Sequence, residues 1–130
     1  MFYLLSKRIS LEYRLVMAAL TTEQTNFLYL LAYMYMQQSK YTQALQLFRI
    51  LRLHTAENMQ IALTLAFCLY KASRLEEATK VLNSLDTNKL STRQKTAYYF
   101  ISSKVLWDLK KVTESREMLH SYLKCRKLNS

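Results

Sequence analysis

Few side chains in this sequence have the type and spacing that catalysis requires. The two histidines, His54 and His120, have no nucleophile or carboxylate at a helical spacing that would orient them as general bases. Cys68 lies within an apolar run and is expected to be a small buried hydrophobe, whereas Cys125 is a lone thiol among basic residues. A chain without glycine cannot form a phosphate-cradling glycine loop. We therefore predict no enzyme, no catalytic residue, no metal site and no cofactor.

The composition predicts a helical globular domain. The chain has 130 residues, 51% of them apolar and 22% charged, which suits a single domain with a core of ordinary size. It contains no glycine and no proline, so most β-turn chemistry is missing and helices joined by short polar turns are favoured. Two cysteines are too few for a disulfide framework, which is typical of a reducing compartment.

Residues 25–85 contain one helix-turn-helix pattern twice, at a spacing of 34 residues. Alanines recur at two positions of the pattern, and small side chains there let two antiparallel helices approach closely while larger ones fill the groove around them. The matched pairs are Leu31/Leu65, Ala32/Ala66, Tyr35/Leu69, Ser39/Ser73, Tyr41/Leu75, Ala44/Ala78, Phe48/Leu82 and Leu51/Leu85.

This period and pattern resemble the tetratricopeptide repeat (TPR). The resemblance implies an all-α solenoid of about three helix-turn-helix repeats with an N-terminal capping helix. We assign the helix to residues 1–20, the repeats to 25–58 and 59–92, and a degenerate third repeat to 96–124. The third repeat needs a shift of 37 residues, which places Ser103 and Ser115 at the two small positions. The three extra residues fit into the polar segment 86–91, which we interpret as a longer loop.

Hydroxyl residues mark the helix starts. A serine or threonine followed three residues later by glutamine or glutamate can form a capping box, in which two otherwise unpaired backbone N–H groups are satisfied. Since no glycine can end the helices, other residues must close the turns. The predicted boxes are Thr21/Gln24, Ser73/Glu76 and Ser91/Gln94.

A concave groove is the expected binding surface. In the TPR resemblance the first helix of each repeat lines this groove. Other residues of the first helix of repeat one are expected to face its second helix, which leaves Tyr29, Tyr33 and Met36 for the groove. That first helix is also apolar on nearly every side, and such a helix is normally buried on all sides. Its remaining apolar surface must therefore be covered by the N-terminal helix, a second copy or another protein. The predicted groove residues are Tyr29, Tyr33, Met36, Leu63, Phe67, Tyr70, Phe100 and Trp107.

A short TPR domain with a hydrophobic groove resembles the small cytoplasmic chaperones of bacterial type III secretion, which bind the needle subunit or an export accessory protein. The resemblance implies a client helix held in the groove, with a second small chaperone as a further partner. Another TPR class grips an acidic C-terminal tail with lysine and asparagine, but Tyr29 and Tyr33 stand at those positions. We therefore expect a cytoplasmic, bacterial chaperone whose client is not such a tail.

Positive charge leaves two alternatives open. Lysine plus arginine exceed aspartate plus glutamate by ten, and the excess is concentrated after residue 88. Such a balance suits nucleic acid, an anionic surface or an acidic protein. A nucleic-acid binder is not favoured, because no aromatic and basic residues interleave as a base-stacking platform. A homodimeric adaptor stays open.

No uncharged apolar run approaches the length of a membrane span, and the first 20 residues do not read as a signal peptide.

Overall fold

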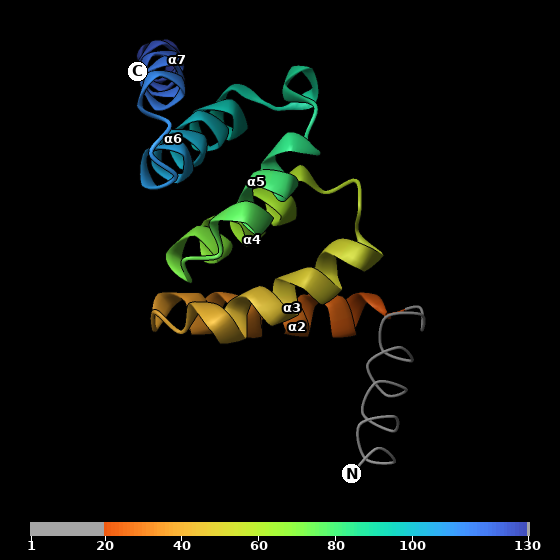
Figure 1. Ribbon diagram of the computed structural model, residues 1–130. Helices are drawn as coiled ribbons and strands as arrows, with labels where there is room; N and C mark the ends of the chain where they lie inside the picture. The colour runs from red at the N-terminus through yellow and green to blue at the C-terminus, as the bar shows by residue number, and fades with distance from the viewer. Residues whose placement is uncertain (1–19, 130) are drawn as a thin grey trace.

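The computed structural model describes residues 20–129, which form helices and connecting turns without a strand (Figure 1). The expected N-terminal capping helix, residues 1–20, lies almost entirely outside the described residues. The predicted all-α class is confirmed for the described part. Its α-helices are α2 (Thr22–Gln37), α3 (Tyr41–His54), α4 (Met59–Lys71), α5 (Leu75–Asn83), α6 (Thr92–Asp108) and α7 (Val112–Asn129), and a short 3-10 helix, η1 (Thr87–Lys89), precedes α6.

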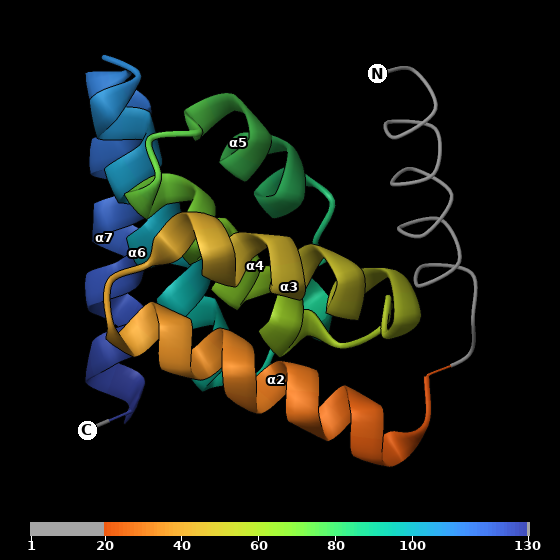
Figure 2. The ribbon, with the colours of Figure 1, turned by 90° about the horizontal axis from the view of Figure 1, so that it is seen from below.

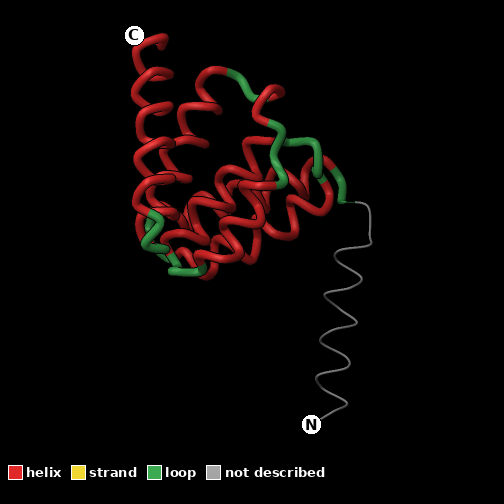
Figure 3. The backbone as a smooth tube through the Cα atoms, turned by 45° about the horizontal axis from the view of Figure 1, so that its top comes forward, coloured by secondary structure: helices red, strands yellow, loops and turns green. Residues whose placement is uncertain are grey.

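The helices form a solenoid of three helical hairpins. Each helix packs against its neighbours in sequence, and α4 also packs against α6, so the first helices of the second and third hairpins lie side by side (Figures 1 and 2). The short turns within the hairpins gather at one edge of the solenoid, and the longer loops between hairpins lie at the opposite edge (Figure 3). Contacts of this kind between neighbouring units are what defines a repeat protein.

Two of the three predicted capping boxes are confirmed. The Thr21 and Ser91 hydroxyls each accept a hydrogen bond from the backbone N–H of a glutamine three residues on, and that glutamine's side chain accepts one in return. The box predicted at Ser73 is wrong. Helix α5 begins after Arg74, whose side chain makes no cap, because Ser73 is used in the preceding turn.

Three residues close the hairpin turns in a left-handed conformation. Ser39, Ser73 and Lys110 have φ values of 60°, 62° and 67°. After each of them, the next N–H donates to the carbonyl five residues earlier, as Arg74 does to Leu69 at 2.8 Å. This is the Schellman arrangement, which normally uses glycine. The chain therefore closes its turns with residues that have a Cβ atom and bear the steric cost of the left-handed region.

Small residues lie where the two helices of each hairpin meet, as the repeat pattern predicts. Ala32, Ala44, Ala66 and Ala78 are all fully buried. In the third hairpin, the buried Ser115 hydroxyl donates to the backbone carbonyl of Ser103, at 2.7 Å. The serines thus keep the close approach and add a hydrogen bond between α6 and α7.

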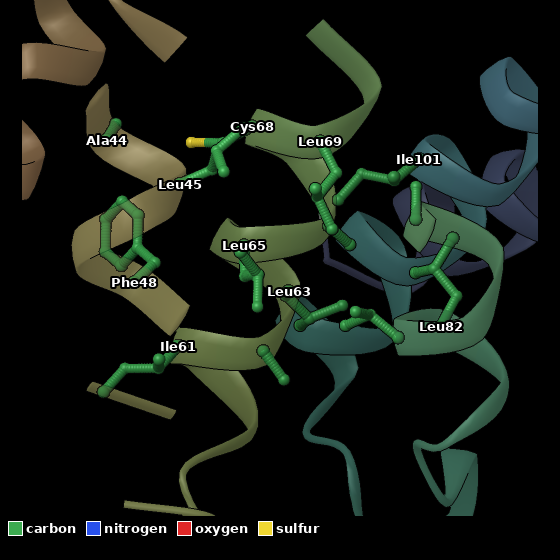
Figure 4. Packing of buried hydrophobic residues seen from close by; sticks show 14 of the residues in the cluster. Ala44, Leu45, Phe48, Ile61, Leu63, Leu65, Cys68, Leu69, Leu82 and Ile101 are labelled. Carbon is green, nitrogen blue, oxygen red and sulfur yellow. The ribbon is translucent and has the colours of Figure 1, made fainter. Parts of the chain in front are cut away.

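The larger packing residues form a continuous core that runs through the hairpins. Phe48, Leu65 and Leu82 are buried with the alanines, whereas Leu31 on α2 is only partly buried. Figure 4 shows α4 between its neighbours, with Cys68 beside Leu45 of α3. Helix α4 is buried along most of its length because helices pack on both of its sides.

Candidate protein-binding groove

The first helices of the three hairpins together line an apolar pocket that is open to solvent. Its volume is about 220 Å³, and its lining comes from α2, α4 and α6 together. No charged side chain contributes to the lining, so a partner's apolar group can enter without removing a charge from water. The lining residues are Tyr33, Met36, Gln60, Leu63, Thr64, Phe67, Ala97, Phe100 and Ile101.

The structure brings five of the eight predicted groove residues to this pocket. They are Tyr33 and Met36 from α2, Leu63 and Phe67 from α4, and Phe100 from α6. Leu63 is fully buried, while Phe100 is exposed at the surface. The pocket therefore has a core residue within its lining and aromatic side chains at its opening. Apolar side chains with few polar groups among them are typical of the lining of ligand pockets.

The other three predicted residues lie outside the pocket lining. Tyr29 packs against Tyr33, with ring centroids 5.1 Å apart. Tyr70 is half-buried beside Lys71, and Trp107 is largely exposed near the end of α6. Tyr29 lies on α2 and Trp107 on α6, so a partner could contact both residues only by spanning all three hairpins.

Tyr29 and Tyr33 also pack against the second helix of their own hairpin, which the sequence reasoning did not foresee. Both rings make edge-on contacts with Phe48 of α3, each with centroids 6.2 Å apart. The expectation that they point away from the second helix is therefore wrong in part. Phe48 is large enough to reach them past the small alanines. These contacts pack both tyrosines against α3, and of the two only Tyr33 also lines the pocket.

Lysines stand over the aromatic rings at two places on the groove. The Lys71 ammonium is 5.8 Å from the Phe67 ring centroid and 5.9 Å from that of Tyr70. The Lys104 ammonium is 5.7 Å from the Phe100 ring centroid. Each contact contributes roughly 0.5–1 kcal/mol at an exposed site. The apolar groove is thus bordered by positive charge, which favours acidic groups beside the apolar face of a partner.

Four of the nine lining residues, Gln60, Thr64, Ala97 and Ile101, were not among the eight predicted groove residues. Thr64 and Ile101 are both buried and belong to the core, which is why repeat positions did not single them out. The Thr64 hydroxyl donates to the Gln60 carbonyl at 2.8 Å, within α4. A polar side chain whose hydrogen bond is already made inside its helix can border an apolar pocket at little cost. Only a three-dimensional view of α4 reveals this.

Burial raises the pKa of three groups in the described helices, Tyr29, Cys68 and Tyr98. Burial raises the pKa of Tyr29, and the neighbouring Tyr33 raises it further. Burial also raises the pKa of Tyr98 on α6. The Cys68 thiol is buried as predicted, and that burial raises its pKa to about 12. A thiol of this kind is a poor nucleophile at neutral pH, so Cys68 serves packing.

Residues that hold metal ions are not grouped in the described part of the chain. No three or more histidine, cysteine, aspartate or glutamate residues come together there. The described helices also include none that is long and apolar enough to cross a membrane. The described residues do form an apolar groove on a helical solenoid, an architecture whose extended surfaces are typical of binding modules.

Comparisons with known families identify the repeats. The model of anaphase-promoting complex, cyclosome, subunit 3 matches residues 10–85, and the model of the SusR N-terminal TPR domain matches residues 53–129. Each covers more than half of the chain, and the chain belongs to the tetratricopeptide-repeat proteins. Neither description names a secretion chaperone. No curated protein and no solved structure matches the chain. The family is one of protein-binding modules, so the partners of this chain are proteins.

Proposed function

We propose that this protein binds an amphipathic helix of a protein partner in the groove between α2, α4 and α6. The observation that carries the proposal is the pocket itself, since large apolar side chains from three separate helices surround one uncharged space. Grooves of this kind recognise the apolar residues that recur on one face of a helix. The tyrosine, phenylalanine and methionine side chains are of the types enriched at the centres of protein interfaces.

The proposed client has a definite chemistry. Its helix carries one or two large apolar residues that enter the pocket, because a space of about 220 Å³ accommodates only a small number of side chains. Acidic residues flank that apolar face, so that they lie near Lys71 and Lys104 at the border of the groove. Such charge pairing increases the association rate and selects the orientation of the helix more than it adds affinity.

The biological role that we propose is that of a cytoplasmic, bacterial chaperone. The resemblance to the small chaperones of type III secretion supports it, because they shield an apolar helix of a small needle or accessory protein before export. The client is then a small secreted or secretion-apparatus protein, and a second small chaperone is a further partner. The groove residues named above are the proposed client-binding set.

Co-purification tests the proposal. The chain is expressed with the products of its neighbouring genes, and the proteins retained on it are identified by mass spectrometry. A double variant, Tyr33→Glu with Phe67→Glu, places two charges at the pocket and is expected to lose the client. Loss of more than tenfold in retained client follows from burying a charge without a partner. Equal retention by the double variant and the native chain would refute groove binding.

Two further variants separate binding from folding. Because Tyr33 contacts Phe48 and Phe67 contacts Tyr41, the double variant could lose stability as well as binding. Phe100→Glu changes a lining residue that is partly exposed, although its ring packs against Tyr122, so it is expected to reduce binding at a smaller cost in stability than the double variant. Leu53→Glu, at an exposed leucine of α3 outside the pocket lining, is expected to retain the client fully.

A further inference from the structure

One face of α2, distinct from the groove, presents an apolar stripe to solvent. Phe27, Leu30 and Met34 are 64%, 61% and 48% exposed. None of them lines the groove pocket. They follow each other at a spacing of three to four residues, which puts them on one side of the helix. Large apolar residues aligned in this way on a surface mark a contact site.

The repeat register shows what kind of element covers such a stripe. The equivalent residues 34 positions later, on α4, are Ile61, Thr64 and Cys68, whose exposures are 2%, 7% and 0%. Helix α3 packs against α4, and Cys68 lies beside a leucine of α3 (Figure 4). The face of α2 is therefore built to receive the second helix of another hairpin.

The opposite end of the solenoid presents the complementary face. Leu119 on α7 is 44% exposed, whereas Leu82, which occupies the equivalent position on α5, is 3% exposed. Helix α5 packs against α6, but no described helix follows α7. Leu123, one turn beyond Leu119, is also exposed. The outer face of α7 is thus equivalent to the face of α5 that packs on α6, the first helix of the following hairpin.

Charge on the two faces is of opposite sign. Helix α2 contains one acidic residue, Glu23, and no lysine or arginine. Glu23 precedes Phe27 by four residues and therefore lies at the N-terminal end of the apolar stripe. The last turns of α7 carry Lys124, Arg126 and Lys127. Consecutive helices of this solenoid pack antiparallel. If α7 of one copy packs in this way on α2 of another, Glu23 at the start of α2 lies near the basic residues at the end of α7.

We propose that two copies of this chain associate head to tail, with the outer face of α7 of one copy packed on the apolar stripe of α2 of the next. The occupant of each exposed face is thus a second copy. The contact reproduces the junction between α3 and α4 and continues the solenoid across the two copies. Because the two faces are different surfaces, a pair of copies keeps one unused face of each kind, and further copies can add.

End-blocking variants of the full chain test the proposal. Leu30→Glu blocks the α2 face, and Leu123→Glu blocks the α7 face. Both leucines are exposed, so the substitutions leave the core intact. Sedimentation velocity over a wide concentration range is expected to show the native chain growing past a dimer, and each variant alone remaining a monomer. An equimolar mixture of the two variants is expected to form a dimer and stop there, because it has one intact face of each kind. Leu53→Glu serves as the control and is expected to behave like the native chain.

Three outcomes would overturn the proposal. A native chain that is monomeric at all concentrations would show that a second copy does not cover the stripe. A mixture of the two blocked variants that stays monomeric would show that the faces do not fit each other. A dimer formed by Leu123→Glu alone would show that α2 faces pair with each other instead.

Discussion

Replacing the three left-handed turn residues by glycine should stabilise this protein. Ser39, Ser73 and Lys110 all have φ near +60° and close Schellman turns in a chain that contains no glycine. A residue with a Cβ atom is disfavoured in this region by about 1–2 kcal/mol. Glycine removes that clash at the three positions without changing the hydrogen bonds that end the helices. The perturbation therefore acts on the backbone alone.

The expected gain is the difference between two opposing effects. Relief of the clash contributes about 1–2 kcal/mol per position, and the greater freedom of glycine in the unfolded chain costs about 0.4–1 kcal/mol. With about 1 kcal/mol of relief and about 0.5 kcal/mol of cost, the net gain is about 0.5 kcal/mol per position. The three turns belong to separate hairpins, so the effects should add to about 1.5 kcal/mol. For a domain of this size, that corresponds to a rise in Tm of about 6 °C.

Thermal and urea unfolding followed by circular dichroism would measure the gain. The triple variant Ser39→Gly, Ser73→Gly and Lys110→Gly is compared with the native chain and with Ser121→Gly. Ser121 lies inside α7, where glycine is unfavourable by about 0.5 kcal/mol, so that variant should melt lower. A triple variant that melts at or below the native temperature would refute the account of the turns.

Two further predictions concern the core. Ser115→Ala should lower the free energy of unfolding by about 1 kcal/mol in urea titrations, because it removes the hydrogen bond to the Ser103 carbonyl. Ser115→Leu should lower it further, since a larger side chain cannot fit between α6 and α7; a Leu variant as stable as the Ala variant would contradict this. Burial raises the pKa of Cys68 from 9.0 to about 12 because the folded core favours the neutral thiol. The neutral thiol therefore contributes its full stabilisation below about pH 9, and this stabilisation is lost as the pH rises towards 12. Cys68→Ala should therefore flatten the decline in Tm above pH 9, and an unchanged decline would show that other groups cause it.

Much of the fold could be predicted from the sequence because the repeat places a small residue where the two helices of each hairpin meet. The alanine pairs and the third pair, Ser103 and Ser115, follow from that one steric requirement. The capping boxes at Thr21 and Ser91 are equally local, since a hydroxyl and a glutamine three residues apart suffice. Local and steric signals of this kind are visible without knowledge of the tertiary structure.

The remaining features depend on geometry that residue spacing does not carry. Ser73 fits a capping box and a turn equally well, and the need to close α4 without glycine decided between them. The contacts of Tyr29 and Tyr33 with Phe48 depend on the reach of a phenylalanine ring across the hairpin. The exposure of Phe27 and Leu30 depends on which helices flank α2.

Photo-crosslinking tests the groove account most directly. A photoreactive phenylalanine analogue is placed at Phe100, in the pocket lining, or at Leu53, on the exposed surface of α3, and each chain is expressed with the products of its neighbouring genes. The account predicts a crosslink from Phe100 to a helical segment of one client and none from Leu53. Equal crosslinking from the two positions, or crosslinking from Leu53 alone, would contradict it.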